Sequence, residues 1–129
     1  MATLTTAVGA SATLRTSGSV ASSFTASDND LNQAAANAVH CSLNYTSSQN
    51  SKAIVRFEVS ADGTTWTEVA VKEPGTGELR AFEVVMKETA TRGVLVPKVL
   101  DYFRAKDKGA GTLAITMVPK QVQIEESVA

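Results

Sequence analysis

The sequence is short of the residues that most often carry chemistry: it has one cysteine, one histidine and one tryptophan in 129 residues. A lone Cys41 cannot form a disulfide within the chain, so no covalent cross-link is expected to stabilise the fold. Cys41 and His40 are adjacent, and adjacent residues of a strand point to opposite faces, so they are not expected to act as nucleophile and base. We therefore expect no catalytic residues, no cofactor and no enzyme activity.

Charge of one sign and long apolar runs are lacking as well. The 12 basic and 13 acidic residues give a net charge of −1, and without a basic patch no nucleic-acid binding is expected. No run approaches the ~18 apolar residues of a membrane span. The first residues also lack the order of a secretion signal, a basic stretch followed by an apolar one. We expect a protein that is made in a cytoplasm and meets no membrane.

Asp28, Asn29 and Asp30 form a small acidic cluster that could bind calcium. A calcium loop of the EF-hand type needs further oxygen ligands, a glycine and a bidentate glutamate at fixed offsets, and these are missing. A turn or a helix cap accounts for the cluster. No metal site is predicted, with calcium binding at these residues as the alternative.

Threonine, serine, valine and alanine dominate the sequence, and aromatic residues make up only 5% of it. This composition favours thin β-layers over a helical bundle. Short β-prone runs separated by turn signals predict an all-β fold. We expect one antiparallel β-sandwich, jelly-roll or Ig-like, of about eight short strands and at most one short helix.

The clearest signal is the stretch from Lys52 to Lys72. Its first run, 53–60, alternates with a period of two, so one face is expected to be buried. That face carries Ala53, Val55, Phe57 and Val59. Asp62-Gly63 supplies the backbone angles of a tight hairpin turn, and the second run is expected to fold back on the first. The same alternation predicts that Val39, Cys41, Leu43 and Tyr45 share a buried face, with His40 on the solvent side.

Two segments are ambiguous. Residues 28–38 have apolar residues at helical spacing, so a short helix and an irregular linker are both open. In 94–108, Pro97 suits the first turn of a helix. The Gly109-Ala110-Gly111 turn instead favours a strand at 102–106 that pairs with 112–118.

Two loops and the end of the last strand are also expected. Residues 73–77 and 88–93 read as loops. Pro119 is expected to end the last strand, because proline cannot donate a hydrogen bond to a sheet.

The two ends are expected to differ from the sandwich. Residues 1–10 form an N-terminal arm, 11–119 the domain and 120–129 a C-terminal tail. Short arms bury too little apolar surface to fold alone and are usually disordered or docked on a neighbour. Their aliphatic residues are therefore the predicted interface. These residues are Leu4, Val8, Val122, Ile124 and Val128.

Trp66 is the most informative single side chain. A large aromatic residue just after the predicted turn is expected to close one end of a valine-rich core. Two alternatives are an exposed platform that stacks on a sugar ring and a contact with a protein partner. Sugar-binding sandwiches usually show several aromatics, and this chain has few.

The run Phe57–Val69, with its Ser-x-Asp-Gly-x-x-Trp pattern, resembles a hairpin of small β-sandwich virion proteins of tailed bacteriophages. Similar hairpins occur in discoidin-like and other jelly-roll modules. The Thr/Ser/Ala-rich start at 11–26, the Tyr102-Phe103-Arg104 strand and the alternating run 112–118 also resemble those proteins. The longer connection at 88–101 departs from their pattern.

This resemblance implies a structural protein of the virion, such as a capsid decoration or a head–tail or tail accessory protein. Its expected partners are copies of itself and other virion proteins such as the major capsid or tail protein. Binding through sheet edges and terminal arms fits this function, because an added strand turns unpaired backbone groups into affinity. The alternative function is a carbohydrate- or receptor-binding module that uses Trp66.

Overall fold

The computed structural model describes residues 2–49 and 51–125. In these residues the chain is all-β, with antiparallel sheets and no helix, as the sequence predicts. Sheet A contains β1 (Ala2–Ala7), β2 (Ala12–Ser19), β5 (Ala38–Thr46), β11 (Ala90–Pro97) and β13 (Thr112–Glu125). Sheet B contains β3 (Thr25–Ala26), β4 (Leu31–Asn32), β6 (Ala53–Ser60), β7 (Thr67–Glu68), β10 (Glu83–Met86) and β12 (Tyr102–Gly109). A separate hairpin contains β8 (Ala70–Lys72) and β9 (Leu79–Ala81).

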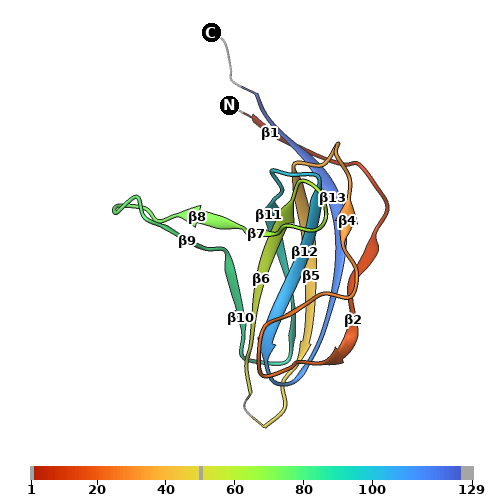
Figure 1. Ribbon diagram of the computed structural model, residues 1–129, viewed down its shortest axis with the longest axis vertical. Helices are drawn as coiled ribbons and strands as arrows, with labels where there is room; N and C mark the ends of the chain where they lie inside the picture. The colour runs from red at the N-terminus through yellow and green to blue at the C-terminus, as the bar shows by residue number, and fades with distance from the viewer. Residues whose placement is uncertain (1, 50, 126–129) are drawn as a thin grey trace.

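Sheets A and B pack face to face as a sandwich (Figure 1). The strand order is β2-β13-β5-β11 in sheet A and β3-β12-β6-β10 in sheet B, and β1 continues the β2 edge of β13. The chain changes sheet between β5 and β6 and again at each connection from β10 to β13. Each sheet therefore joins segments that are far apart in the sequence.

The predicted alternation is confirmed in the core between the sheets. Ala53, Val55, Phe57 and Val59 are at most 3% exposed, and Val39, Cys41, Leu43 and Tyr45 are completely buried. Phe57 stacks on Phe103 with ring centroids 5.6 Å apart. Aromatic pairs of this kind add to the burial that stabilises a core otherwise built from small aliphatic residues.

An ion pair joins the two sheets inside the sandwich. Arg15 of β2 donates from Nε to Asp107 Oδ1 of β12 at 3.0 Å, and Asp107 is only 2% exposed. The pairing of β2 with β13 shifts register on both sides of Arg15. Such bulges redirect a side chain. The shifts explain why Arg15 reaches inward to Asp107 although its neighbour Leu14 is buried as well.

The last two long strands correct a prediction. β12 and β13 do not form a hairpin, because β12 pairs with β6 in sheet B and β13 with β5 in sheet A. The turn between them crosses the sandwich. Gly111 has φ of 94°, and a Cβ there would lie 2.5 Å from the Tyr45 hydroxyl, which donates to the Ala110 carbonyl at 2.7 Å. Buried Tyr45 thus fixes the crossing.

Pro119 corrects a second prediction, because β13 runs through it to Glu125. The Pro119 carbonyl accepts a hydrogen bond from Val8 N at 3.0 Å, so its backbone faces the β1–β2 edge. The pairing with β2 ends at Met117 and that with β1 begins at Lys120. The missing N–H therefore falls at a break between two strands, where it costs no hydrogen bond.

The central hairpin is shorter than predicted. β7 pairs with β6 only at Glu58 and Val59, and the chain then leaves sheet B to form β8. Asp62 lies in a loop instead of a two-residue turn, and its carboxylate accepts hydrogen bonds from Thr64 N and Thr65 N, both at 2.9 Å.

The two ambiguous segments are decided by the structure. Residues 28–37 form β4 and turns, which fits the irregular linker and not the helix. Pro97 ends β11, and the strand predicted at 102–106 is confirmed within β12. The loop predicted at 88–93 contains only residues 88 and 89, because β11 begins at Ala90. Several strands have two or three residues, so the structure has more strands than the eight expected.

Candidate interaction surfaces

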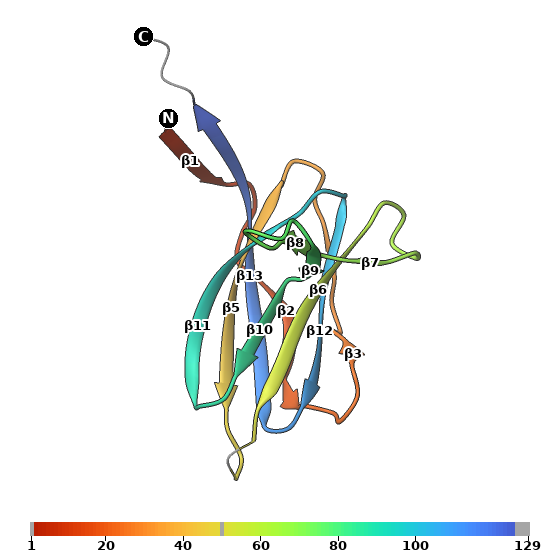
Figure 2. The same cartoon turned by 90° about the vertical axis from the view of Figure 1, so that its left-hand side faces the viewer.

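The N-terminal arm and the C-terminal tail pair with each other. β1 runs antiparallel to the end of β13, with Leu4 opposite Gln123, Thr5 opposite Val122 and Thr3 opposite Ile124. This two-stranded ribbon extends beyond the sandwich in both views (Figures 1 and 2). Four of the five predicted interface residues thus lie on one ribbon or at its base, where Val8 is half-buried. The fifth, Val128, lies outside the described residues.

In the ribbon, one edge of β13 pairs with β1, and Asn37 covers part of its other edge. Asn37 Nδ2 donates to the Val122 carbonyl at 2.8 Å, and Val122 N donates to Asn37 Oδ1 at 2.7 Å. A side-chain amide has the same donor and acceptor as a peptide group. Asn37 therefore takes the place of a neighbouring strand at Val122, just beyond the point where β5 ends its pairing at Lys120.

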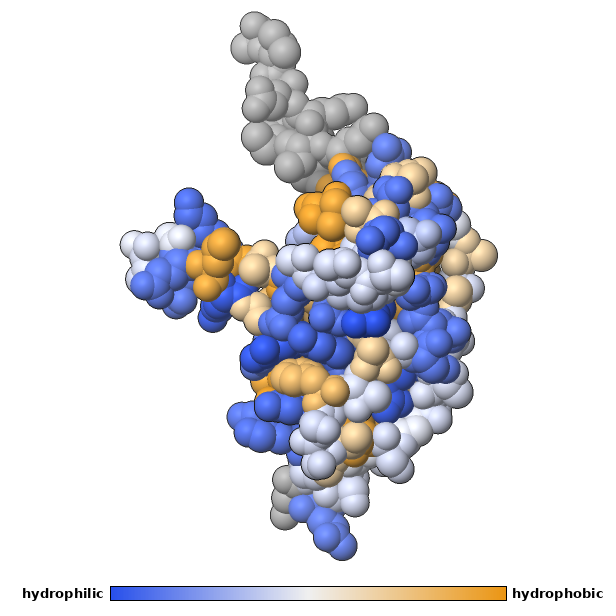
Figure 3. All heavy atoms as spheres, in the orientation of Figure 1, coloured by the Kyte–Doolittle hydropathy of each residue, from blue (hydrophilic) through white to orange (hydrophobic). Residues whose placement is uncertain are grey.

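An apolar patch lies at the same end of the sandwich and was not predicted. Its exposed members are Leu95, Val99 and Leu100, which are 45%, 78% and 37% exposed. A groove of about 330 Å³ beside Leu95 is lined by Asn37, Ala38, Leu95, Pro97 and Val122. A second groove of about 240 Å³ lies beside Val99 and Leu100. Figure 3 shows hydrophobic surface where the ribbon leaves the sandwich. The aliphatic run 94–100 was a sequence signal for this patch.

Lys98 secures the backbone beneath this patch. Its Nζ donates to the Gln33 carbonyl at 2.6 Å, and the residue is 2% exposed. Burial lowers the pKa of Lys98, and the Asp101 carboxylate partly opposes this shift. An ammonium group held by backbone carbonyls ties 98–101 to the turn at 33–36, so the exposed patch rests on a fixed support.

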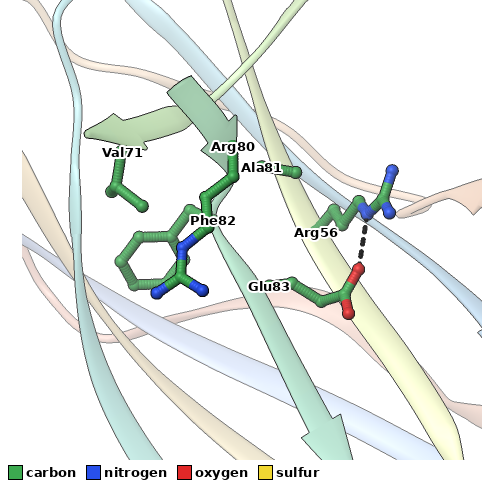
Figure 4. A pocket seen from close by; sticks show the side chains of 6 residues that line it. All are labelled: Arg56, Val71, Arg80, Ala81, Phe82 and Glu83. Carbon is green, nitrogen blue, oxygen red and sulfur yellow. Dashed lines mark hydrogen bonds and ion pairs between the residues drawn. The ribbon is translucent and has the colours of Figure 1, made fainter. Parts of the chain in front are cut away.

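The hairpin of β8 and β9 projects from the sandwich (Figure 1). Its strands pair only with each other, and Leu79 is 74% exposed. A groove of about 440 Å³ at its base is lined by Arg56, Val71, Arg80, Ala81, Phe82 and Glu83. Figure 4 shows the Arg56–Glu83 pair at 2.8 Å on one side of this groove and Phe82 and Arg80 on the other. The hairpin therefore offers a second protruding surface.

The outer face of sheet B carries a ladder of alternating charges. Glu58 pairs with Arg104 at 2.9 Å and with Lys106 at 3.5 Å, and Lys106 also pairs with Glu68 at 2.7 Å. The same ladder continues through Arg56 to Glu83. Acids and bases therefore neutralise each other along this ladder.

Trp66 belongs to this outer face, which corrects the prediction that it closes the core. It is half-buried, and the Arg104 guanidinium lies 4.2 Å from its ring centroid. Arg104 covers one face of the indole, and Trp66 lines none of the grooves described here. The pattern of one aromatic after a turn did not distinguish a core position from a cation–π contact on the surface.

Cys41 and His40 are not brought together as a nucleophile and its base, because they lie on opposite faces of β5. Burial raises the pKa of the Cys41 thiol to about 12, which removes it as a nucleophile. His40 lies half-buried on the other face of β5, as predicted, with its Nε2 close to Gly93. Within 2–49 and 51–125 no group of three or more metal-ligating side chains is present, and no helix is long and apolar enough to cross a membrane.

Comparisons with protein-family models, with curated proteins and with solved structures found no match to this chain. The function must therefore be argued from the ribbon, the apolar patch and the hairpin.

Proposed function

We propose that this protein is a non-enzymatic structural component of a bacteriophage virion, a capsid decoration or head–tail or tail accessory protein. It acts in the virion as an oligomer and binds other virion proteins such as the major capsid or tail protein. The observation that carries the proposal is the pair of two-stranded elements that protrude from the sandwich, the β1–β13 ribbon and the β8–β9 hairpin.

The stability of such elements supports a role in assembly. An isolated two-stranded hairpin is at best marginally stable in water, because it has no second layer to bury its apolar face. Leu79 on one element and Leu95 beside the other remain exposed to solvent. Contact with a neighbouring protein covers such residues and completes both elements, as expected for a protein whose function is assembly.

The strand order supports the same proposal. We infer that the sandwich is a jelly roll, because its sheets have the order β2-β13-β5-β11 and β3-β12-β6-β10 with repeated crossing between them. Jelly rolls occur in viral capsid proteins and also in lectins. The covered face of Trp66 favours the first of these two functions.

The test uses the phage whose genome carries this sequence. Mass spectrometry of its purified particles is expected to detect the protein in many copies. Particles from a phage that lacks the gene are expected to take up purified protein to saturation in a sedimentation assay. Absence from the particles together with failure to sediment with them contradicts the proposal.

A further inference from the structure

Strand β11 is a long edge of sheet A that no other strand covers. Among the described residues it pairs with β5 on one side and with no strand on the other, and it forms the left margin of the sandwich in Figure 2. Its eight residues pair with β5 without a register shift, and Arg92 is the only charged one. Short strands, bulges, charges and covering segments are the usual protection of a sheet edge. β11 has little of this protection, whereas β3 and β4 have two residues each and β2 is bulged.

The backbone groups that point to this open edge follow from the pairing with β5. Lys98 N donates to the Asn37 carbonyl at 2.9 Å, at the position where the register of β11 and β5 continues. Hydrogen-bonded positions alternate along an antiparallel pair, so the even-numbered residues of β11 bond to β5. Thr91, Gly93 and Leu95 therefore direct their N–H and C=O groups outward. All three are exposed, and no other described group bonds to their backbone.

We propose that β11 pairs with β11 of a second copy about a two-fold axis at Gly93, so that the two A sheets join into one continuous antiparallel sheet. The three open positions are centred on Gly93, and this axis pairs Gly93 with Gly93 and Thr91 with Leu95. Every open N–H and C=O of these positions in both strands then has a partner. The proposal deepens the proposed function, because it identifies the contact between copies, and it rests on the self-association named there.

The side chains favour a second copy as the occupant of this edge. Arg92 lies opposite Val94 of the other copy, so like charges do not face each other across the pair. Pro97, which has no N–H to donate, lies opposite Thr89, outside β11, where the pairing has ended. An axis at Val94 would instead pair Pro97 with Thr91 and lose a hydrogen bond. An axis at Arg92 would place the two arginines directly opposite each other.

Pairing with a second copy also closes the edge. A two-fold contact uses the same edge of both partners, so the sheet stops growing on this side after two copies. The contact covers Leu95, which is 45% exposed, with Thr91 of the other copy. A strand added to a sheet edge commonly combines backbone hydrogen bonds with side-chain contacts of this kind.

A disulfide test on mixed copies reads the register directly. In an equimolar mixture of Thr91→Cys and Leu95→Cys, the two cysteines face each other at a hydrogen-bonded position, about 5.5 Å between Cα atoms, which a disulfide spans. In either variant alone, the two cysteines lie four residues apart along the strands, about 14 Å, and cannot be linked. Both positions are exposed, so the substitutions are expected to leave the fold intact. Cys41 does not compete, because burial raises the pKa of its thiol to about 12.

Under mild oxidation the mixture is expected to form a covalent dimer, while each variant alone stays monomeric. Equal cross-linking in the single variants, or no cross-linking in the mixture at the highest soluble concentration, overturns the proposal.

Hydrogen exchange tests the unmodified chain. The Gly93 and Leu95 amides are expected to gain protection as the protein concentration rises, while the Val94 amide, which bonds to β5, stays protected throughout. Protection of Gly93 and Leu95 that appears only when phage particles are added assigns the edge to another virion protein and also overturns the proposal.

Particle binding is measured separately by sedimentation. Cross-linking in the mixture without binding to particles supports the paired β11 strands and contradicts the virion function. Binding to particles without cross-linking leaves the virion function standing and rejects β11 as the contact between copies.

Discussion

At the scale of single residues, Trp66 lies on the outer face of sheet B and not in the core. Its contact is the Arg104 guanidinium at 4.2 Å, outside the core cluster. We expect Trp66→Ala to lower the free energy of unfolding by about 1–2 kcal/mol, the range of a partly exposed cation–π contact with some lost packing. Phe103→Ala, which empties a fully buried site, is expected to cost about 3–5 kcal/mol. Urea denaturation measures both.

Equal losses in the two variants would contradict the surface position of Trp66. Arg104→Met provides the matched control, because it keeps an apolar stem against the ring and removes only the charge. Arg104→Met is expected to reproduce part of the loss in free energy of unfolding that Trp66→Ala causes. Its own loss also contains the broken ion pair between Arg104 and Glu58.

Asp62, in the loop after β6, is expected to make the free energy of unfolding depend on pH in the acid range. Hydrogen bonds from Thr65 N, Thr64 N and the Ser60 hydroxyl hold the pKa of this carboxyl well below its usual range. The folded state therefore releases this proton more readily than the unfolded chain does. The resulting stabilisation is complete above the unfolded pKa of about 4 and is lost as the pH falls through the lower folded pKa.

Asp62→Asn removes this titration. The free energy of unfolding of the wild type is expected to exceed that of the variant near neutral pH, and the difference is expected to shrink below about pH 4. Urea midpoints measured across the acid range test the change. Glu88→Gln removes one negative charge without removing a described hydrogen bond and serves as the charge-matched control. A constant gap between wild type and Asp62→Asn would show that the carboxylate does not stabilise the loop.

At the scale of elements, the Arg15–Asp107 pair connects the two sheets. Arg15 also donates to the Leu113 carbonyl, so one guanidinium links β2, β12 and β13. Arg15→Met leaves the 2%-exposed carboxylate of Asp107 without its counter-charge. We expect this change to cost about 3–5 kcal/mol in free energy of unfolding, as for other broken buried pairs.

The double variant Arg15→Met with Asp107→Leu tests the cause. Replacing both charges by apolar groups removes the buried carboxylate, and most of the lost stability is expected to return. Thermal and urea denaturation of the two variants give the comparison. A double variant as unstable as the single one would assign the loss to the backbone hydrogen bonds of Arg15 instead of to the charge.

The elements also show what the sequence could predict. A period of two identifies the buried face of a strand, so Val55, Phe57 and Cys41 were placed correctly. It does not identify the partner strand, because the same face is buried in either sheet. Gly109-Ala110-Gly111 therefore suggested a hairpin where the buried Tyr45 directs a crossing between sheets. Pro119 was predicted to end the last strand, because the sequence does not show that the pairing of β13 changes there from β2 to β1, which accommodates the proline.

The candidate surfaces were predicted only in part. Aliphatic residues in both ends marked the ribbon, but their pairing with each other depends on a register that alternation alone does not specify. Leu95, Val99 and Leu100 were hidden in a segment whose secondary structure was ambiguous. Residues 70–81 look like ordinary strands around a loop, and nothing in them shows that they leave the sheet.

At the scale of the whole molecule, the sandwich and its protrusions have separate tasks. The core lies between sheets A and B, whereas β8 and β9 pair only with each other. A hairpin of this kind adds little to the stability of the sandwich, because the free energy of folding comes mainly from buried apolar surface. Under the proposed function, the hairpin instead contacts a neighbouring protein.

Removing the hairpin tests this division. Ala70 pairs with Ala81, so a two-residue Asn-Gly turn can replace residues 71–80 without opening the chain. We expect a change of less than about 1 kcal/mol in the free energy of unfolding, as for a surface change outside the core, and a clear loss of sedimentation with phage particles. Leu79→Ser keeps the hairpin and removes its most exposed leucine, so it is expected to weaken sedimentation without abolishing the fold. If the shortened protein unfolds, the hairpin belongs to the folding unit; if it sediments like the wild type, the particle is bound through the ribbon and the apolar patch.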